Sequence, residues 1–272
     1  MAAQDAAFER VHAPSCQVGL ILTGPQVFAA IADEQRLVGL HKYALQDTKV
    51  TQLHRQHLEQ LYREVDWLRW PFRSVQVASW DAPFTLVPES FHQVSLEEVG
   101  ALMHGQPNEW ARSATPAGFE VAFHAEKGLQ EWVAQSFDVG QLSHPFSSLL
   151  PYLKQQRPLH EGKQIHVHVH ATRLAIVALD HNTIQLANTF SYQSQDDFLY
   201  YCLLAYEQLG YDPEEDPIVL SGEITRDGQL YPLLYRYVRD IRFATWPKQW
   251  IIGDFAGHLP AHFYLDLLAL LA

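Results

Sequence analysis

Cysteine, basic side chains and long apolar runs are all scarce in this chain of 272 residues. Its two cysteines, Cys16 and Cys202, cannot build a disulfide framework, and both lie in apolar patterns that predict buried free thiols. The longest apolar run, FYLDLLALLA, contains Asp266 and is too short to cross a bilayer. Because the first residues also lack the basic and apolar regions of a signal peptide, we expect a cytoplasmic protein with no membrane insertion.

Basic residues number 19 against 31 acidic ones, which gives a net charge of −12. Phosphate backbones and anionic lipids would be repelled on average, so we expect no nucleic-acid partner. Hydrophobic residues make up 47% of the chain, which is the composition of a packed globular protein. The length suits one large domain or two smaller ones, each large enough to bury a core.

The first third of the chain has the pattern of a strand meander followed by a helix. Residues 1–15 are predicted as a loose N-terminal tail. Short turns at Gly24-Pro25 and at 33–36 connect only antiparallel neighbours, and they separate apolar, β-branched strands expected at 16–23, 25–33 and 37–45. A helix capped by Thr48 and a further strand are expected next, at 49–68 and 74–80.

The middle of the chain gives weaker signals. Ser95 and Glu98 have the spacing of a capping box and Gly105 is a typical C-cap, so a short helix is predicted there. Gln106–Gly118 contains two prolines and many small polar residues and is predicted as a linker. The flanking patterns predict strands at 84–88 and 119–124 and helices at 128–137 and 144–156.

Residues 164–243 carry the clearest pattern, which predicts three strands, a helix, a strand and a helix. In the long helix, expected at 195–209, Ser194 and Asp197 have capping-box spacing and Gly210 ends the helix. Capping accounts for the acidic pair Asp196-Asp197, because the helix then presents one apolar stripe to the core. The alternative for this pair is a carboxylate site for a metal ion.

Residues 17–80 and 165–223 follow one order: strand, tight turn, strand, polar turn, strand, helix, strand. Two copies of a β-β-β-α-β-α unit are the layout of the actin-like ATPases, a variant of the ribonuclease H-like fold. We therefore predict an α/β protein with mixed sheets, whose crossover connections are right-handed. We expect an N-terminal tail at 1–15, a first ribonuclease H-like half at 16–117 and a second at 118–272. The two halves are expected to enclose a cleft.

Four short motifs follow one another in the second copy: an Asn-x-Phe-x-Tyr strand end, an Asp-Phe-x-Tyr helix start, a Leu-Gly helix end and a Ser-Gly-Glu-Ile element. They lie at Asn188, Phe190 and Tyr192; Asp197, Phe198 and Tyr200; Leu209 and Gly210; and 221–224. With the C-terminal LPAHFYLDLLAL, they resemble an uncharacterised bacterial family placed in the actin-like ATPase fold. This resemblance implies a fold and no assigned reaction.

The actin-like fold holds ATP with two glycine-containing hairpins and a glycine turn, where backbone N–H groups bind the phosphates. The corresponding residues here are Thr23, Gly24, Thr172, Arg173, Ser221, Gly222 and Glu223. The first hairpin lacks the usual aspartate and its Pro25 has no N–H to donate, while the second has neither glycine nor aspartate. The residues thus predict a degenerate nucleotide site, and neither ATP nor Mg²⁺ is an expected cofactor.

Three histidines, His166, His168 and His170, alternate along one strand and therefore share a face, with neighbours about 6.6 Å apart. Two such histidines are able to bind zinc, but the spacing identifies no third ligand and there is no HExxH motif. A half-exposed, histidine-rich sheet face is the preferred interpretation, and a metal site is the alternative.

Glu223 and Asp81 end equivalent strands and are the candidates for any residual catalysis. The sequence contains no nucleophile elbow, P-loop or dinucleotide fingerprint. We therefore expect a non-catalytic actin-like scaffold or assembly protein that binds a protein partner or a second copy of itself. The alternatives are an ATPase or small-molecule kinase with an atypical ATP cleft, and a metal-binding protein.

Overall fold

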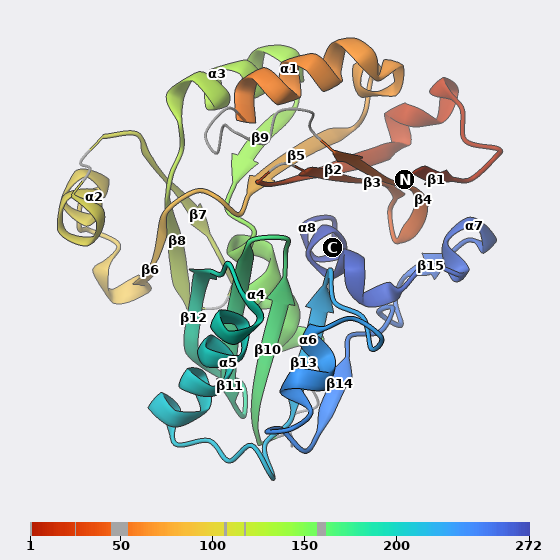
Figure 1. The fold of residues 1–272 in the computed structure, drawn as a ribbon. Helices are drawn as coiled ribbons and strands as arrows, with labels where there is room; N and C mark the ends of the chain where they lie inside the picture. The colour runs from red at the N-terminus through yellow and green to blue at the C-terminus, as the bar shows by residue number, and fades with distance from the viewer. Residues whose placement is uncertain (1, 25, 45–53, 106–107, 117, 157–161) are drawn as a thin grey trace. The chain divides into compact units, whose positions relative to one another are not determined.

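The computed structural model describes residues 2–24, 26–44, 54–105, 108–116, 118–156 and 162–272 (Figure 1). The chain forms two compact units. Unit 1 comprises Met1–Tyr152, Lys248–Leu259 and Asp266–Ala272, and unit 2 comprises Leu153–Pro247 and Pro260–Leu265. The boundary expected between 117 and 118 falls within unit 1, because the strand at 119–124 pairs with the strand at 84–88.

Unit 1 is built on a sheet in which an antiparallel meander is extended by parallel strands. The meander consists of β2 (Cys16–Thr23), β3 (Gln26–Asp33) and β4 (Arg36–Ala44). Two parallel strands continue the sheet beside β2, namely β5 (Ser74–Ser79) and β9 (Gly140–Ser143). The meander and β5 confirm the predicted strands, whereas the four-residue β9 was not predicted.

Two helices cover one face of this sheet (Figure 1), namely α1 (His54–Glu64) and α3 (Lys127–Ser136). They are joined by aromatic side chains, because Tyr62 meets Trp132 and Phe137 edge to face with ring centroids 5.7 and 5.4 Å apart. The helix predicted at 49–68 is described from His54 onward and ends earlier, followed by the 3-10 helix η2 (Asp66–Arg69). Its expected N-cap, Thr48, lies outside the described residues.

The segment expected as a loose tail is ordered against the edge of this sheet. Strand β1 (Ala2–Gln4) pairs antiparallel with β4, and the 3-10 helix η1 (Arg10–Ser15) follows. Phe8 is buried and its ring lies 5.7 Å from that of Trp70, so apolar burial holds the segment down. From the far end of the chain, β15 (Ile251–Ile252) pairs parallel with the start of β4.

Between β5 and α3, unit 1 contains a smaller antiparallel sheet with the order β6-β8-β7. Its strands are β6 (Phe84–Pro88), β7 (Trp110–Ala114) and β8 (Phe119–His124), and it also carries η3 (Glu89–Phe91) and helix α2 (Leu96–His104). The linker prediction for 106–118 was wrong at β7, where Trp110 stacks on His104 with ring centroids 4.9 Å apart. The capping prediction for α2 is confirmed: Ser95 and Glu98 form a capping box and Gly105 ends the helix at φ 66°.

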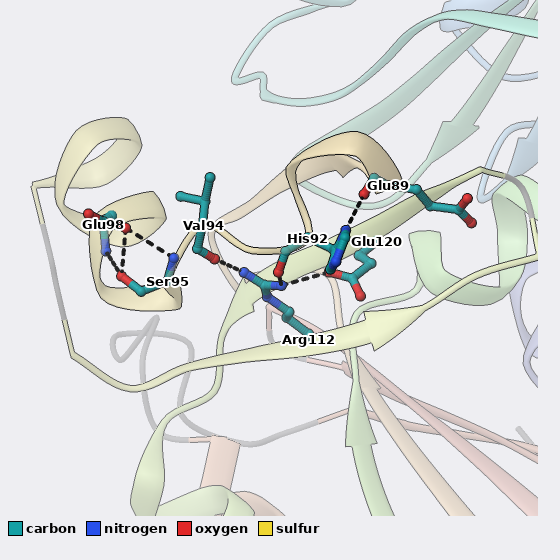
Figure 2. A network of polar contacts seen from close by, with 7 residues as sticks. All are labelled: Glu89, His92, Val94, Ser95, Glu98, Arg112 and Glu120. Atoms are coloured by element: carbon teal, nitrogen blue, oxygen red, sulfur yellow. Dashed lines mark hydrogen bonds and ion pairs between the residues drawn. The ribbon is translucent and has the colours of Figure 1, made fainter.

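Arg112 of β7 holds the connection between β6 and α2 against this small sheet (Figure 2). Its guanidinium donates to the carbonyl oxygens of His92, at 2.5 Å, and of Val94. The same group binds the Glu120 carboxylate of β8 at 3.0 Å. A single planar donor therefore satisfies several acceptors at once, which is the geometry that favours arginine over lysine.

Unit 2 repeats the sheet of unit 1 with the order β12-β11-β10-β13-β14. Its strands are β10 (Lys163–Val169), β11 (Arg173–Asp180), β12 (Thr183–Ser191), β13 (Ile218–Gly222) and β14 (Ile241–Phe243). Helix α5 (Gln195–Leu209) packs on one face through buried Phe198, Cys202 and Ala205, as the apolar stripe predicts. Both cysteines of the chain are buried free thiols, which confirms that prediction.

The internal repeat extends to details of the backbone. Strands β3 and β11 both have eight residues, and β4 and β12 both have nine. The register shifts at the same place in both meanders, between Ile31 and Ala32 and between Ala178 and Leu179. Each polar turn also begins with a residue at positive φ, 50° at Glu34 and 51° at His181. The predicted α/β fold with two ribonuclease H-like copies is confirmed.

Of the remaining helices, α4 (Phe146–Gln156) is as long as α1. The others are short: α6 (Leu230–Leu234), α7 (Asp254–Gly257), η4 (Ala261–Tyr264) and α8 (Leu265–Leu270). The second helix expected in the stretch 164–243 is thus reduced to the five residues of α6. Within the described part of the chain, no helix combines the length and the hydropathy that a membrane span requires.

The capping box of α5 gives a first testable expectation. The Ser194 hydroxyl accepts the backbone N–H of Asp197, and the Asp197 carboxylate accepts the N–H of Ser194 in return. Ser194→Ala removes the cap and is expected to lower the free energy of unfolding by about 1 kcal/mol. Urea denaturation measures the change, with Ser191→Ala at an exposed strand end as the control. Equal stabilities of the two variants would show that the cap contributes nothing.

Candidate functional site

The ends of β10 and β13 bring together most of the unit 2 residues predicted for nucleotide binding. The two strands run parallel, with His168 opposite Ser221 and Val169 opposite Gly222. Their carboxyl ends therefore meet at one edge of the sheet, which is where ligands bind in open α/β sheets. The turn that follows β10 closes on itself, because the His170 N–H donates to the Arg173 carbonyl oxygen at 2.8 Å. Thr172 lies exposed in this turn, and its carbonyl accepts the Tyr192 N–H.

Gly222 is required by the contact between these two strands. Its φ is 78°, and a Cβ atom placed there would lie 2.1 Å from the carbonyl oxygen of Val169. The next residue, Glu223, donates its N–H to the same oxygen at 2.7 Å. The single glycine of the predicted adenosine turn therefore has a packing reason of its own, since only glycine lets the backbones approach this closely.

Two of the three predicted metal ligands lie side by side next to this turn. The rings of His168 and His170 are 4.6 Å apart between centroids, and both side chains are buried. The His168 Nδ1 forms a 2.8 Å hydrogen bond with the Ser221 hydroxyl, while the half-buried His166 contacts the Gln164 side chain instead. The expectation of a half-exposed histidine face was wrong for His168 and His170. Zinc binding by these residues stays the alternative interpretation.

Glu223 lies among groups that remain neutral donors. Burial, followed by the nearby Glu223 carboxylate, raises the pKa of the Tyr192 and Tyr264 hydroxyls. Tyr192 donates its hydroxyl to the His170 carbonyl oxygen at 2.7 Å. His262 donates from Nε2 to the Ile224 carbonyl at 2.7 Å, and its pKa is lowered mainly by burial. The Glu223 carboxylate therefore lies near two tyrosine hydroxyls, and the bonds from Tyr192 and His262 fix two backbone carbonyls of unit 2.

The predicted residues of unit 1 form a direct contact that the sequence did not suggest. The N–H of Gly24, at the tip of the β2–β3 hairpin, donates to the Asp81 carboxylate at 2.6 Å. Asp81 comes shortly after β5, and its own N–H donates to the Ser79 hydroxyl at 3.2 Å. Thr23 is buried at the end of β2. Pro25 lies outside the described residues. The glycine N–H of the first hairpin therefore binds an anion that the chain itself supplies.

A buried polar contact in unit 1 was not predicted. The indole N–H of Trp80 donates to the Asp266 carboxylate at 2.9 Å, and both side chains are buried. His144 is also buried and stacks on Phe84 with ring centroids 4.4 Å apart. The only available signal was Asp266 itself, a charge in the middle of an apolar run, which indicates a satisfied buried group.

Comparison with known proteins gives a family and a fold. Residues 20–241 match the family described as "Protein of unknown function (DUF3822)". A solved structure from Bacteroides thetaiotaomicron, with an actin-like ATPase fold and unknown function, is similar with a TM-score of 0.80 and 18% identity. That match covers 98% of this chain and 99% of the other chain. No curated protein matches the sequence.

Two further structures are similar at lower identity. The PilM–PilN type IV pilus biogenesis complex matches with a TM-score of 0.67 and 13% identity, over 94% of this chain and 97% of that chain. The ethanolamine utilization protein EutJ of Carboxydothermus hydrogenoformans matches with a TM-score of 0.51 and 10% identity, over 95% and 89%. At such identities the likeness concerns the fold alone. The actin-like fold is thus confirmed.

Proposed function

The chain belongs to DUF3822, a family of proteins of unknown function, and has an actin-like fold; we propose that it is a non-catalytic protein that acts by binding other proteins. In this proposal its phosphate-binding elements are degenerate, and neither ATP nor Mg²⁺ is a cofactor. The observation that carries the proposal is the hydrogen bond between the Gly24 N–H and the Asp81 carboxylate at 2.6 Å.

That hydrogen bond opposes phosphate binding in two ways. A hydrogen bond to a charged group contributes about 1.5–3 kcal/mol, which a phosphate would have to replace. A phosphate oxygen that approached the same N–H would also lie close to the carboxylate, where like charges about 4 Å apart repel by about 4 kcal/mol near a protein surface. In this proposal the Asp81 carboxylate takes the place of a bound phosphate at the Gly24 N–H and does not serve as a Mg²⁺ ligand.

The second hairpin supports the same proposal. Its turn contains no glycine, and the N–H of His170 is used by the Arg173 carbonyl oxygen. The carbonyl of His170 accepts the Tyr192 hydroxyl, so this turn is held by bonds within unit 2. A protein-binding role is supported by the fold of PilM, whose solved structure is a complex with PilN.

Calorimetry with Mg-ATP tests the proposal on the full chain. We expect no binding heat at millimolar nucleotide for the natural protein, because the hairpin donors are already occupied. The variant Asp81→Asn keeps an acceptor for the Gly24 N–H but removes the negative charge. It therefore distinguishes repulsion of phosphate by the Asp81 charge from occupation of the Gly24 N–H as the cause of weak nucleotide binding. Micromolar affinity of the natural protein for Mg-ATP would overturn the proposal and favour the ATPase or kinase with Glu223 and Asp81. Thermal unfolding of both proteins checks that they are folded.

A further inference from the structure

Strand β12 is an unusually long open edge of the unit 2 sheet. It has nine residues, and β11 is its one strand partner among the described residues. The other edge strands in the described parts of the chain, namely β1, β15, β9, β14, β6 and β7, have five residues or fewer. No residue of β12 is fully buried. A row of backbone N–H and C=O groups therefore lies along this edge for pairing. One of these groups, the Thr189 N–H, donates to the Asn188 side-chain oxygen at 2.8 Å, a bond that an added strand would replace.

The first copy of the repeat covers the equivalent edge. Strand β4 corresponds to β12, and its outer side is paired by β1 over Gly39, Leu40 and His41 and by β15 over Arg36 and Leu37. The Asp5 N–H adds a bond to the Val38 carbonyl oxygen at 2.9 Å. The same edge thus accepts added strands in unit 1, whereas in unit 2 the described residues supply none.

The side chains of β12 lack the features that protect exposed edges. Its sequence, TIQLANTFS, has no charged residue, no proline and no glycine. By contrast, the opposite edge of the same sheet, β14, has three residues and carries Arg242, which is paired with Asp240 at 2.6 Å. Natural proteins prevent strand addition with short edges, charges and proline. A short length and a charge guard β14, and β12 has neither; the register shift of β12 lies before Leu186, outside the residues proposed below to pair.

We propose that β12 is the interface at which a second copy of this chain pairs, strand to strand and antiparallel, about a two-fold axis beside Asn188. The residues of β12 that correspond to the paired part of β4 are Leu186, Ala187 and Asn188. With the axis beside Asn188, Leu186 of one copy lies opposite Phe190 of the other. Ala187 then lies opposite Thr189, and Asn188 faces itself, so one sheet continues through both copies.

A second copy suits this edge better than an unrelated strand because the pattern is complementary to itself. Leu186 and Phe190 both pack against the α5 side of the sheet, and the Phe190 ring stacks on Tyr201 with centroids 4.6 Å apart. The two-fold pairing therefore joins an aliphatic to an aromatic side chain on that face, which is a favourable cross-strand pair. It places no like charges opposite each other, although the chain as a whole carries −12.

The test is the mass of the natural full chain in solution, measured by light scattering and by sedimentation. We expect twice the 31.1 kDa of one chain at micromolar concentration. Asn188 is exposed and faces itself across the axis, so Asn188→Lys and Asn188→Asp should each give monomers through repulsion. An equimolar mixture of these two variants should restore the dimer, because lysine then faces aspartate. Thr85→Lys, on the five-residue edge β6, is the matched control and should remain dimeric.

Three outcomes would overturn the inference: a natural chain that is monomeric throughout, an Asn188→Lys variant that stays dimeric, or a mixture that stays monomeric. Thr189→Pro provides a second variant, because it deletes a backbone N–H of the edge without adding charge. It is expected to give a monomer with an unchanged circular dichroism spectrum. The inference does not rest on the proposed function, since nucleotide calorimetry and mass measurement give independent results.

Discussion

Gly222→Ala is expected to destabilise unit 2 by about 3 kcal/mol or more. The added Cβ would lie 2.1 Å from the Val169 carbonyl oxygen and 2.7 Å from the Val169 nitrogen, at a φ of 78°. Both neighbours are backbone atoms of β10, so no side-chain rotation relieves the contact. The parallel pairing of β13 with β10 would have to open, and with it the 2.7 Å bond from Glu223 to Val169.

Gly210→Ala is the matched control for this variant. Gly210 also has a positive φ, 62°, but a Cβ there would meet no atom within 4 Å. Alanine at Gly210 should therefore cost only the conformational penalty of the left-handed region, about 1 kcal/mol. Urea unfolding of the two variants measures the difference. A Gly222→Ala variant no less stable than Gly210→Ala would show that the strands have room to separate without cost.

The second large effect is a loss of stability in acid that originates at His41. This side chain is 6% exposed on β4, with its ring 5.0 Å from Trp67 and 6.0 Å from Tyr43 between centroids. Burial lowers the pKa of His41 from 6.5 to about 4. Between pH 6.5 and pH 4, His41 therefore binds a proton in the unfolded chain but not in the folded chain. The free energy of unfolding should fall by about 3 kcal/mol between pH 6.5 and pH 4, and this contribution should be constant below pH 4.

A His41→Leu variant isolates this contribution, because leucine fills the buried position without a titrating group. Between pH 6.5 and pH 4, the unfolding free energy of the natural protein should fall by about 3 kcal/mol more than that of this variant. Leu40→Met, at a buried apolar position of the same strand, is the control for altered packing and should leave the natural pH profile unchanged, because neither leucine nor methionine titrates. His262, whose pKa burial also lowers, contributes equally to all three proteins. A pH-independent difference for His41→Leu would refute the assignment.

Local patterns predicted much of this fold correctly because their information lies within a few residues. The capping boxes at Ser95 and Ser194 and the left-handed caps at Gly105 and Gly210 all follow from spacing alone. The antiparallel meanders follow from strands joined by short turns. The order of elements in the two copies then indicated the repeat, which the equal strand lengths confirm.

Elements with little local signal were missed or misassigned. Strands β1, β7 and β9 have three to five residues, too few for alternation to be distinguished from chance. Each exists because a longer neighbour provides the hydrogen bonds, such as β4 for β1 and β8 for β7. The segment 1–15 was expected to be loose for the same reason, since its anchors, β4 and Trp70, lie elsewhere in the chain.

The sequence by itself determined two copies of one α/β unit and the helix caps at Ser95 and Ser194. Only the tertiary structure decided which groups the turns of the two copies contact. The Gly24 N–H meets a carboxylate 57 residues away, and the Trp80 indole meets one 186 residues away. It likewise decided that the edge of β4 is covered while that of β12 is open. Contacts of this kind depend on where distant segments come to lie, which residue spacing does not encode.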